Sequence, residues 1–146
     1  MRPSSLSVVI VATLCMVACV HAGGGPTWKD LIGTWTNELG STCTLRDAGA
    51  GVLDGNYTTA VGGSWASQPV VARYSQSLQN PGILLEMSVI WTGHATRAIT
   101  TWIGQCFCGA DGTPYIQTMW LLARETNQSN AWASITTGSD LFVKAA

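Results

Sequence analysis

The sequence has few charged residues. Only 10% of its 146 residues are Asp, Glu, Lys or Arg, the formal net charge is −1, and no run of acidic or basic residues occurs. A nucleic-acid interface needs clustered basic side chains, and a polyanion or membrane surface attracts a similar patch. We therefore expect neither nucleic acid nor a membrane surface as a partner.

Histidine and cysteine are also scarce. After residue 22 the chain contains one histidine, His94, and three cysteines, Cys43, Cys106 and Cys108. General acid–base catalysis uses paired titratable groups, so we expect no enzyme and no cofactor. The spacing of these residues fits no zinc pattern, and three cysteines are too few for a disulfide framework. An odd count leaves a free thiol or a bridge to another chain.

Only the N-terminus carries a long apolar run. Arg2 precedes an apolar stretch over 6–20, and small or short residues lead up to Ala22. This pattern predicts a secretory signal peptide over residues 1–22 and one mature domain over 23–146. The alternative, a membrane anchor, needs a longer apolar segment. We expect a secreted, extracellular protein, in which Asn56 and Asn127 begin possible glycosylation sequons.

No helical apolar stripe appears after the signal segment. Clusters of turn residues instead separate short runs rich in Thr, Val, Ile, Trp and Tyr, a pattern typical of an all-β sandwich or barrel. Eight such antiparallel strands can close into an up-and-down β-barrel, which removes exposed sheet edges and can hold one small ligand. The predicted strands cover residues 31–37, 41–46, 52–61, 69–76, 83–91, 98–108, 114–123 and 131–143.

Alternation along these strands places aromatic and hydroxyl side chains on the same face. The face of Tyr57 carries Thr59 and Val61, and the face of Trp102 carries Thr100. A buried hydroxyl without a partner costs about 1–3 kcal/mol, so this mixture favours a cavity for a small, rigid, partly polar molecule. The alternatives are tryptophans that serve only the core, a lipocalin-like carrier of an apolar ligand, and a structural or carbohydrate-binding role.

Several stretches together resemble one known family. They are GTWTNELGSTCTL (33–45), DGNYTTAVG (54–62), TTWIGQCF (100–107), QTMWLLA (117–123) and NAWASITTGSDLF (130–142). In order and spacing they are similar to the avidin and streptavidin family of biotin-binding proteins, across about residues 30–143. The resemblance implies an eight-stranded barrel that binds biotin with high affinity in its lumen and sequesters it.

The resemblance also assigns the polar contacts to biotin. Asn37, Ser41 and Tyr57 would donate to the ureido oxygen, and Thr59 and Asp140 would accept from the two ureido N–H groups. These types suit a ureido group, which needs about three donors and two acceptors in a dry site. Asn37 and Ser41 could alternatively be simple turn residues.

The remaining contacts implied by the resemblance are mostly apolar. Thr100 would face the thioether sulfur, and the ring walls would be Trp91, Trp102, Trp120 and Leu122. Val61, Gly63 and Ser64 would begin a lid over the valeryl chain. Trp132 would enter the pocket of a neighbouring subunit, which implies a homotetramer.

Some positions depart from the family pattern. Ala98 stands where a serine would meet the biotin carboxylate, so Ser64, Thr96 or backbone N–H groups of residues 63 and 64 would take that role, or the tail is held less well. Met87 replaces a usual aromatic, and Lys29 replaces the cysteine that would pair with Cys106. A bridge from Cys43 to Cys106 or Cys108 is one possibility, and free buried thiols are the other.

Overall fold

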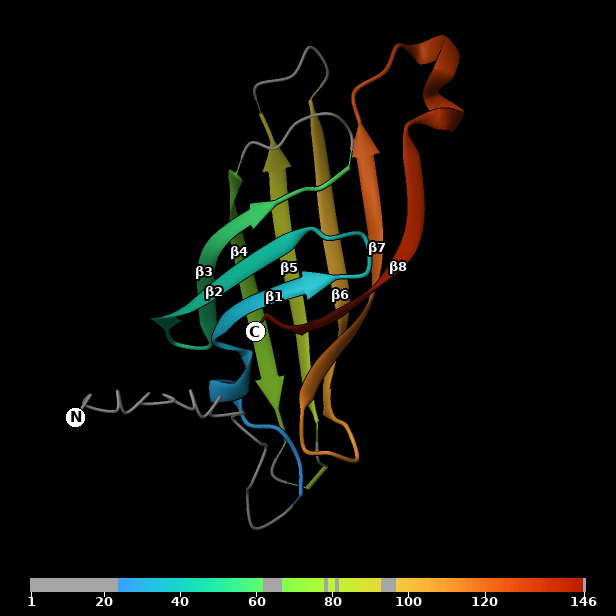
Figure 1. Ribbon diagram of the computed structural model, residues 1–146. Helices are drawn as coiled ribbons and strands as arrows, with labels where there is room; N and C mark the ends of the chain where they lie inside the picture. Colours follow the sequence, from blue (N-terminus) through green and yellow to red (C-terminus); the bar gives the residue numbers. More distant parts are fainter. Residues whose placement is uncertain (1–23, 62–66, 78, 81, 93–96, 146) are drawn as a thin grey trace, which may run out of the picture.

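The computed structural model describes residues 24–61, 67–77, 79–80, 82–92 and 97–145, which contain a closed barrel of eight antiparallel strands (Figure 1). Each strand pairs with the next along the chain, and the last pairs with the first. This confirms the predicted all-β, up-and-down barrel. The strands are β1 Gly33–Asn37, β2 Thr42–Gly49, β3 Val52–Thr58, β4 Ser67–Gln76, β5 Ile83–Trp91, β6 Ala98–Cys108, β7 Pro114–Arg124 and β8 Ile135–Lys144.

Two short 3₁₀ helices accompany the barrel, η1 Trp28–Leu31 and η2 Gln128–Ala133. Within the described ranges, no helix is long and apolar enough to cross a membrane. The predicted signal peptide, residues 1–22, lies outside the described residues and stays a prediction.

Both helices include positions that we expected to belong to strands. Residue 31 belongs to η1, where the carboxylate of Asp30 accepts from the backbone N–H of Thr27 at 2.6 Å and from its hydroxyl at 3.0 Å. Residues 131–133 belong to η2, where Asn127 Oδ1 accepts from the N–H of Asn130 at 3.1 Å. Side chains that bond to the nearby backbone favour such turns over strand pairing.

The expected strand over 52–61 ends three residues early, at Thr58. The hydroxyl of Thr59 donates to the carbonyl of Val61 at 3.0 Å and accepts from its N–H at 3.2 Å, which makes a local turn. Val61 therefore does not continue the face of Tyr57, and half of its side chain is exposed. The predicted alternation fails there because the strand has already ended.

The strand register arranges the lumen of β5 to β8 in rungs. The lowest rung that includes all four strands is apolar and buried, and it consists of Ile83, Cys106, Ile116 and Phe142. A middle rung consists of Met87, Trp102, Trp120 and Gly138. The highest rung consists of Trp91, Ala98 and Arg124. The core therefore fills the lower end in Figure 1, and the polar and aromatic positions lie above it.

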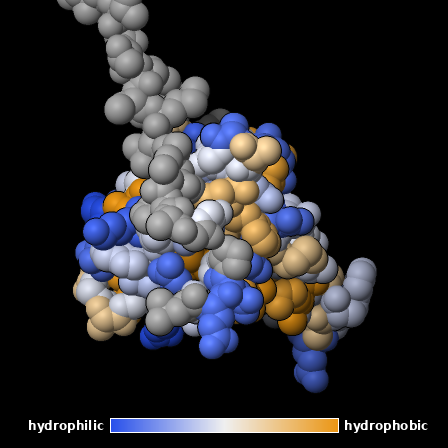
Figure 2. Space-filling view, turned by 90° about the horizontal axis from the view of Figure 1, so that it is seen from below, coloured by the Kyte–Doolittle hydropathy of each residue, from blue (hydrophilic) through white to orange (hydrophobic). Residues whose placement is uncertain are grey.

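The outer surface mixes ion pairs with exposed hydrophobic side chains. Arg46 pairs with Asp54, Arg73 with Glu86 and Arg97 with Glu125, at 2.9–3.4 Å. Seen from the lower end, hydrophobic and hydrophilic side chains lie beside one another around the barrel (Figure 2). A groove of about 250 Å³ over β4, β5 and β6 borders the Arg73–Glu86 pair.

Candidate functional site

The turn between β1 and β2 presents a hydrogen-bond donor to the lumen. Asn37 Oδ1 accepts from the backbone N–H groups of Leu39 at 3.2 Å and Ser41 at 2.8 Å. Gly40, with a φ of 82°, closes the turn, since its N–H donates to the Asn37 carbonyl at 3.0 Å. The two bonds to Oδ1 fix the orientation of the amide, whose nitrogen has no partner among the described residues. No fully buried side-chain nitrogen of the described residues lacks a partner, so this nitrogen keeps some exposure and is available to a ligand inside the barrel.

Ser41 and Tyr57 supply two further hydroxyls. Ser41 is fully buried, its Oγ accepts from the N–H of Ala60 at 3.0 Å, and its hydroxyl proton is directed towards Tyr57. Burial raises the pKa of Tyr57, a hydrogen bond from the Ser41 side chain lowers it, and the charge of Asp140 raises it again. The phenol therefore keeps its proton at physiological pH. Together with the Asn37 amide, this end of the site gathers three groups that carry donor hydrogens, two of which, Ser41 and Tyr57, are linked to each other.

A buried carboxylate faces these donors from β8. Asp140 Oδ2 accepts from the indole N–H of Trp102 at 2.8 Å, and the Asp140 side chain is almost completely buried. In the described part of the chain, Oδ1 has no partner. No fully buried side-chain oxygen of the described residues lacks a partner, so Oδ1 keeps some exposure and is suited to accept an N–H from a ligand.

Aromatic rings connect the two polar groups. The ring of Tyr57 stacks on Trp102 with a centroid separation of 4.9 Å and meets Trp91 edge-on at 5.7 Å. The indole N–H of Trp91 donates to Thr100 Oγ1 at 2.8 Å, which fixes the ring at the upper end of β5. These contacts build a site with rigid apolar walls and a few polar groups, as small-molecule sites usually have.

No metal chemistry accompanies this arrangement. In the ranges that the structure describes, no three His, Cys, Asp or Glu side chains gather as a metal ion would need. The groove over β4, β5 and β6 contains none of the polar residues above. The chemistry that the site offers is hydrogen bonding and apolar contact inside the barrel.

Comparison with known proteins identifies the family of this chain. The model of the avidin family matches residues 26–145. The chain belongs to the avidin family. Avidin-related protein 4/5 of Gallus gallus is 31% identical over 119 residues, which cover 78% of this chain and 77% of that protein. Avidin of Gallus gallus is 27% identical over 143 residues, which cover 94% of this chain and 93% of avidin.

In this avidin-family chain, the structure gathers most of the predicted site residues. Those that are buried in the barrel are Asn37, Ser41, Tyr57, Thr100, Trp102 and Asp140. Trp91, Trp120 and Leu122 are half-buried on the lumen face. Their contacts with a ligand stay a prediction, but the expected donors, acceptor and aromatic walls lie together.

Five other predicted residues follow the end of β3 or fall outside the described chain. The hydroxyl of Thr59 is engaged with Val61, and both lie beyond the end of β3. Gly63 and Ser64 lie outside the described residues, as does Thr96. Their predicted roles in a lid and at the biotin tail remain untested.

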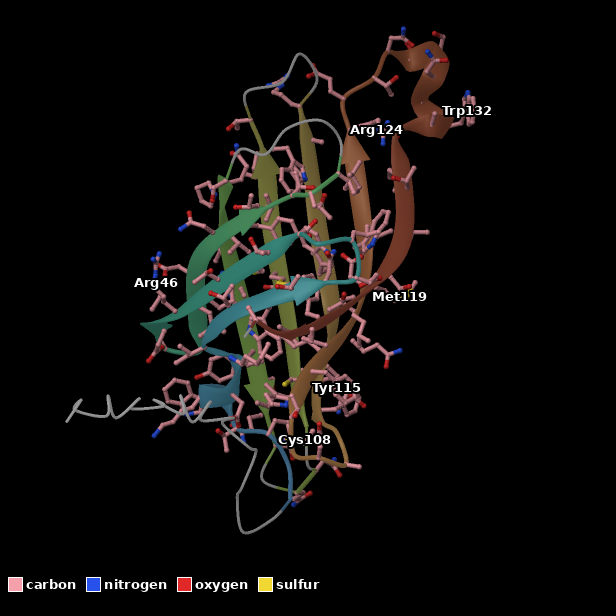
Figure 3. All side chains as sticks on the ribbon, in the orientation of Figure 1. Arg46, Cys108, Tyr115, Met119, Arg124 and Trp132 are labelled. Atoms are coloured by element: carbon pink, nitrogen blue, oxygen red, sulfur yellow. The ribbon has the colours of Figure 1, made fainter. Side chains whose placement is uncertain are left out.

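Trp132 lies far from the lumen of its own chain. It belongs to η2, its side chain is 85% exposed, and Figure 3 shows it pointing away from the barrel. Its own chain leaves the indole almost without contacts, so the predicted role in a neighbouring subunit is sterically open.

Of the two alternatives for Cys43, the bridge to Cys106 or Cys108 is not formed. Cys43 on β2 and Cys106 on β6 are both free and buried, as in the alternative prediction. Burial raises the pKa of each thiol to about 12. Asn56 on β3 and Asn127 before η2 are exposed, and their glycosylation is untested.

The departures from the avidin pattern are accommodated in the barrel. Met87 is fully buried and pairs in register with Trp102. Lys29 is exposed, and its ammonium lies 5.9 Å from the ring of Trp28. Ala98 stands in the highest rung between Trp91 and Arg124.

Two residues of the site were missed by the sequence reasoning. A Cβ on Gly138 would lie 2.4 Å from Cζ2 of Trp120, so glycine allows this indole to lie against β8. A glycine inside a strand is a known signal of such close approach. The carboxylate of Glu38 accepts from the N–H of Leu141 at 2.9 Å and links the donor turn to the strand of Asp140. No local sequence pattern could predict that contact, since Glu38 and Leu141 are 103 residues apart.

Proposed function

We propose that this protein binds biotin inside the barrel, without catalysis, and thereby withholds it. The observation that carries the proposal is that donor groups and a carboxylate oxygen without a partner lie on the lumen side of the same barrel. Asn37, Ser41 and Tyr57 offer donors from β1, the following turn and β3, and Asp140 offers an unpaired carboxylate oxygen from β8. A ureido group has one acceptor oxygen flanked by two N–H donors and complements this arrangement.

The aromatic walls support the same ligand. Trp102 and Tyr57 stack, and Trp91 is held by Thr100, so the rings have fixed orientations before a ligand arrives. Rigid walls lower the ordering cost of binding and so favour high affinity. The bicyclic ring of biotin is apolar on its faces and would lie against them, with Trp120 beside Trp102 in the same rung and Leu122 above.

Assembly into a homotetramer and secretion belong to the proposal. Large hydrophobic side chains are exposed on the outer face of β5 to β8, namely Ile90, Ile99, Ile103, Met119, Leu121 and Ile135. Exposed apolar surface of this extent is typical of subunit interfaces. The exposed Trp132 at η2 would complete a neighbouring subunit's pocket. Residues 1–22 would direct secretion.

A biotin titration tests the proposal. The full chain, secreted from a eukaryotic host, is titrated with biotin while tryptophan fluorescence and melting temperature are followed, and native mass spectrometry counts ligands per assembly. We expect one biotin per chain, a change in fluorescence and a higher melting temperature, since the ligand binds only the folded state. Uptake of a fatty acid or retinol with no response to saturating biotin would overturn it in favour of a lipocalin-like carrier.

A further inference from the structure

The highest rung of the barrel carries a cation on the lumen face. Arg124 ends β7, pairs in register with Ala98 of β6, and Ala98 pairs with Trp91 of β5. Residues two apart on a strand share a face, so Arg124 continues the lumen-facing series of Thr118, Trp120 and Leu122. Figure 3 shows Arg124 at the upper end of β7, away from the apolar lower end of the barrel.

The neighbouring charges of this rung lie on the opposite face. Arg97 and Glu125 form a two-pronged ion pair, with N–O distances of 3.0 and 2.9 Å, outside the barrel. The backbone N–H of Arg124 donates to the Ser134 carbonyl at 2.8 Å. Among the described residues, however, its guanidinium has no ion-pair or hydrogen-bond partner. The lumen side of the rim thus keeps a positive charge, whereas the outer side is neutralised.

We propose that the Arg124 guanidinium forms the subsite for the carboxylate at the end of the ligand's aliphatic tail. The inference rests on the proposed function, because it needs the ureido end to lie at Asn37 and Asp140. The tail then runs upward past Leu122, and Arg124 lies two pleats above Trp120, about 13 Å along the strand. The valerate chain, extending upward from the ring beside Trp120, and the side chain of Arg124, extending towards it, together span this distance of about 13 Å.

The composition of the rung favours a charged contact. The methyl group of Ala98 has no donor for a carboxylate, and its paired neighbour Arg124 carries five N–H donors in a planar fork that matches two carboxylate oxygens. Charge-assisted bonds of this kind are stronger than those from a serine hydroxyl. The subsite selects for an anionic end group, whereas the ureido end selects for the ring.

The test compares two ligands that differ only at the tail. Biotin carries a carboxylate and biotinamide a neutral amide, and both have the same ureido ring. Dissociation constants are measured by competition for the wild type, Arg124→Gln, Arg124→Lys and the outer-face control Arg97→Gln, at 25 and 250 mM salt. Thermal unfolding of each variant checks that the barrel is intact.

We expect the wild type and Arg97→Gln to prefer biotin, and this preference to shrink at high salt because the rim is solvent-accessible. Arg124→Gln should weaken biotin about 3- to 10-fold, the range of an exposed to partly buried ion pair, and leave biotinamide unchanged. Arg124→Lys should restore part of the preference. An equal biotin-to-biotinamide ratio in the wild type and Arg124→Gln would overturn the subsite while biotin binding stands. Failure of every form to bind either ligand would overturn the proposed function itself.

Discussion

Replacing Asp140 by asparagine removes one buried charge from the barrel and leaves the side-chain volume almost unchanged. In the wild type, Oδ2 accepts from the Trp102 indole at 2.8 Å and Oδ1 is available to a ureido N–H. The asparagine amide has one oxygen and one NH₂ group. Both the Trp102 N–H and the ureido N–H are donors, so in the bound state one of them must face the NH₂ group of the asparagine instead of an acceptor.

The cost to binding follows from that conflict. A hydrogen bond to a charged group contributes about 1.5–3 kcal/mol, and a buried donor without an acceptor costs about 1–3 kcal/mol. We expect a combined loss of about 3–5 kcal/mol, or roughly 100- to 4000-fold in biotin affinity. Without ligand the amide can turn its oxygen to Trp102, so the free energy of unfolding should fall by only about 1 kcal/mol.

Competition binding and urea unfolding at 25 °C measure the two quantities on the same preparation. Asp54→Asn, which changes an exposed carboxylate that pairs with Arg46 on the outer face, is the matched control and should alter neither by much. Binding of biotin by Asp140→Asn within threefold of the wild type would refute the assignment of Asp140 as the ligand's acceptor. So would a loss of affinity that merely equals the loss of stability.

Further predictions address the wall, the thiols, the subunit contact and the link between turn and strand. Gly138→Ala would place a methyl group 2.4 Å from Cζ2 of Trp120 and should lower the free energy of unfolding by about 1–3 kcal/mol, measured against the outer-face control Ser139→Ala; equal stability would contradict the packing. At pH 8 a thiol with a pKa of about 12 is ionised about once in ten thousand molecules, so peptide mapping should find Cys43 and Cys106 labelled by iodoacetamide only after unfolding. Because folding raises both pKa values from 9.0, their contribution to stability is complete below pH 9 and lost towards pH 12, and Cys43→Ala should flatten that alkaline decline in urea titrations. Trp132→Ala should leave the stability of an isolated chain unchanged, since the indole is 85% exposed, but should weaken both association and biotin binding in sedimentation and titration experiments; a change in only one would contradict a shared wall. Glu38→Gln should accelerate biotin dissociation about 3- to 10-fold in stopped-flow chases by loosening the bond to Leu141, whereas Glu86→Gln on the outer face should not.

The fold followed from local signals that the structure preserves. Turn clusters separated runs of β-branched and aromatic residues, and the eight strands lie where those runs do, with errors at their ends. Three of these errors share a cause, because Asp30, Asn127 and Thr59 each bond to nearby backbone and replace strand pairing by a turn. Such short-range competition depends on side-chain geometry, which periodicity does not contain.

The site was predictable in its residue types but not in its internal partners. The bond from Trp102 to Asp140 joins residues 38 apart, and the bond from Trp91 to Thr100 joins the adjacent strands β5 and β6. Neither bond leaves a pattern in the sequence. The same holds for the cysteines, whose shared lumen-facing parity allowed a bridge. The structure places Cys43 and Cys106 on β2 and β6 as separate thiols. Parity gives the face of a strand, whereas contact depends on register around the whole barrel.

The closure of the barrel between β1 and β8 determines how the two ends of the site face each other. The register joins only Trp35 with Lys144, Thr36 with Val143 and Asn37 with Phe142. Beyond Asn37 the chain turns away, and the carboxylate of Glu38 takes over the next backbone N–H of β8, at Leu141. That bond joins the residue that follows the donor Asn37 to the residue that follows the acceptor Asp140. The separation of Asn37 and Asp140 therefore depends on a surface side chain as well as on the strand ladder.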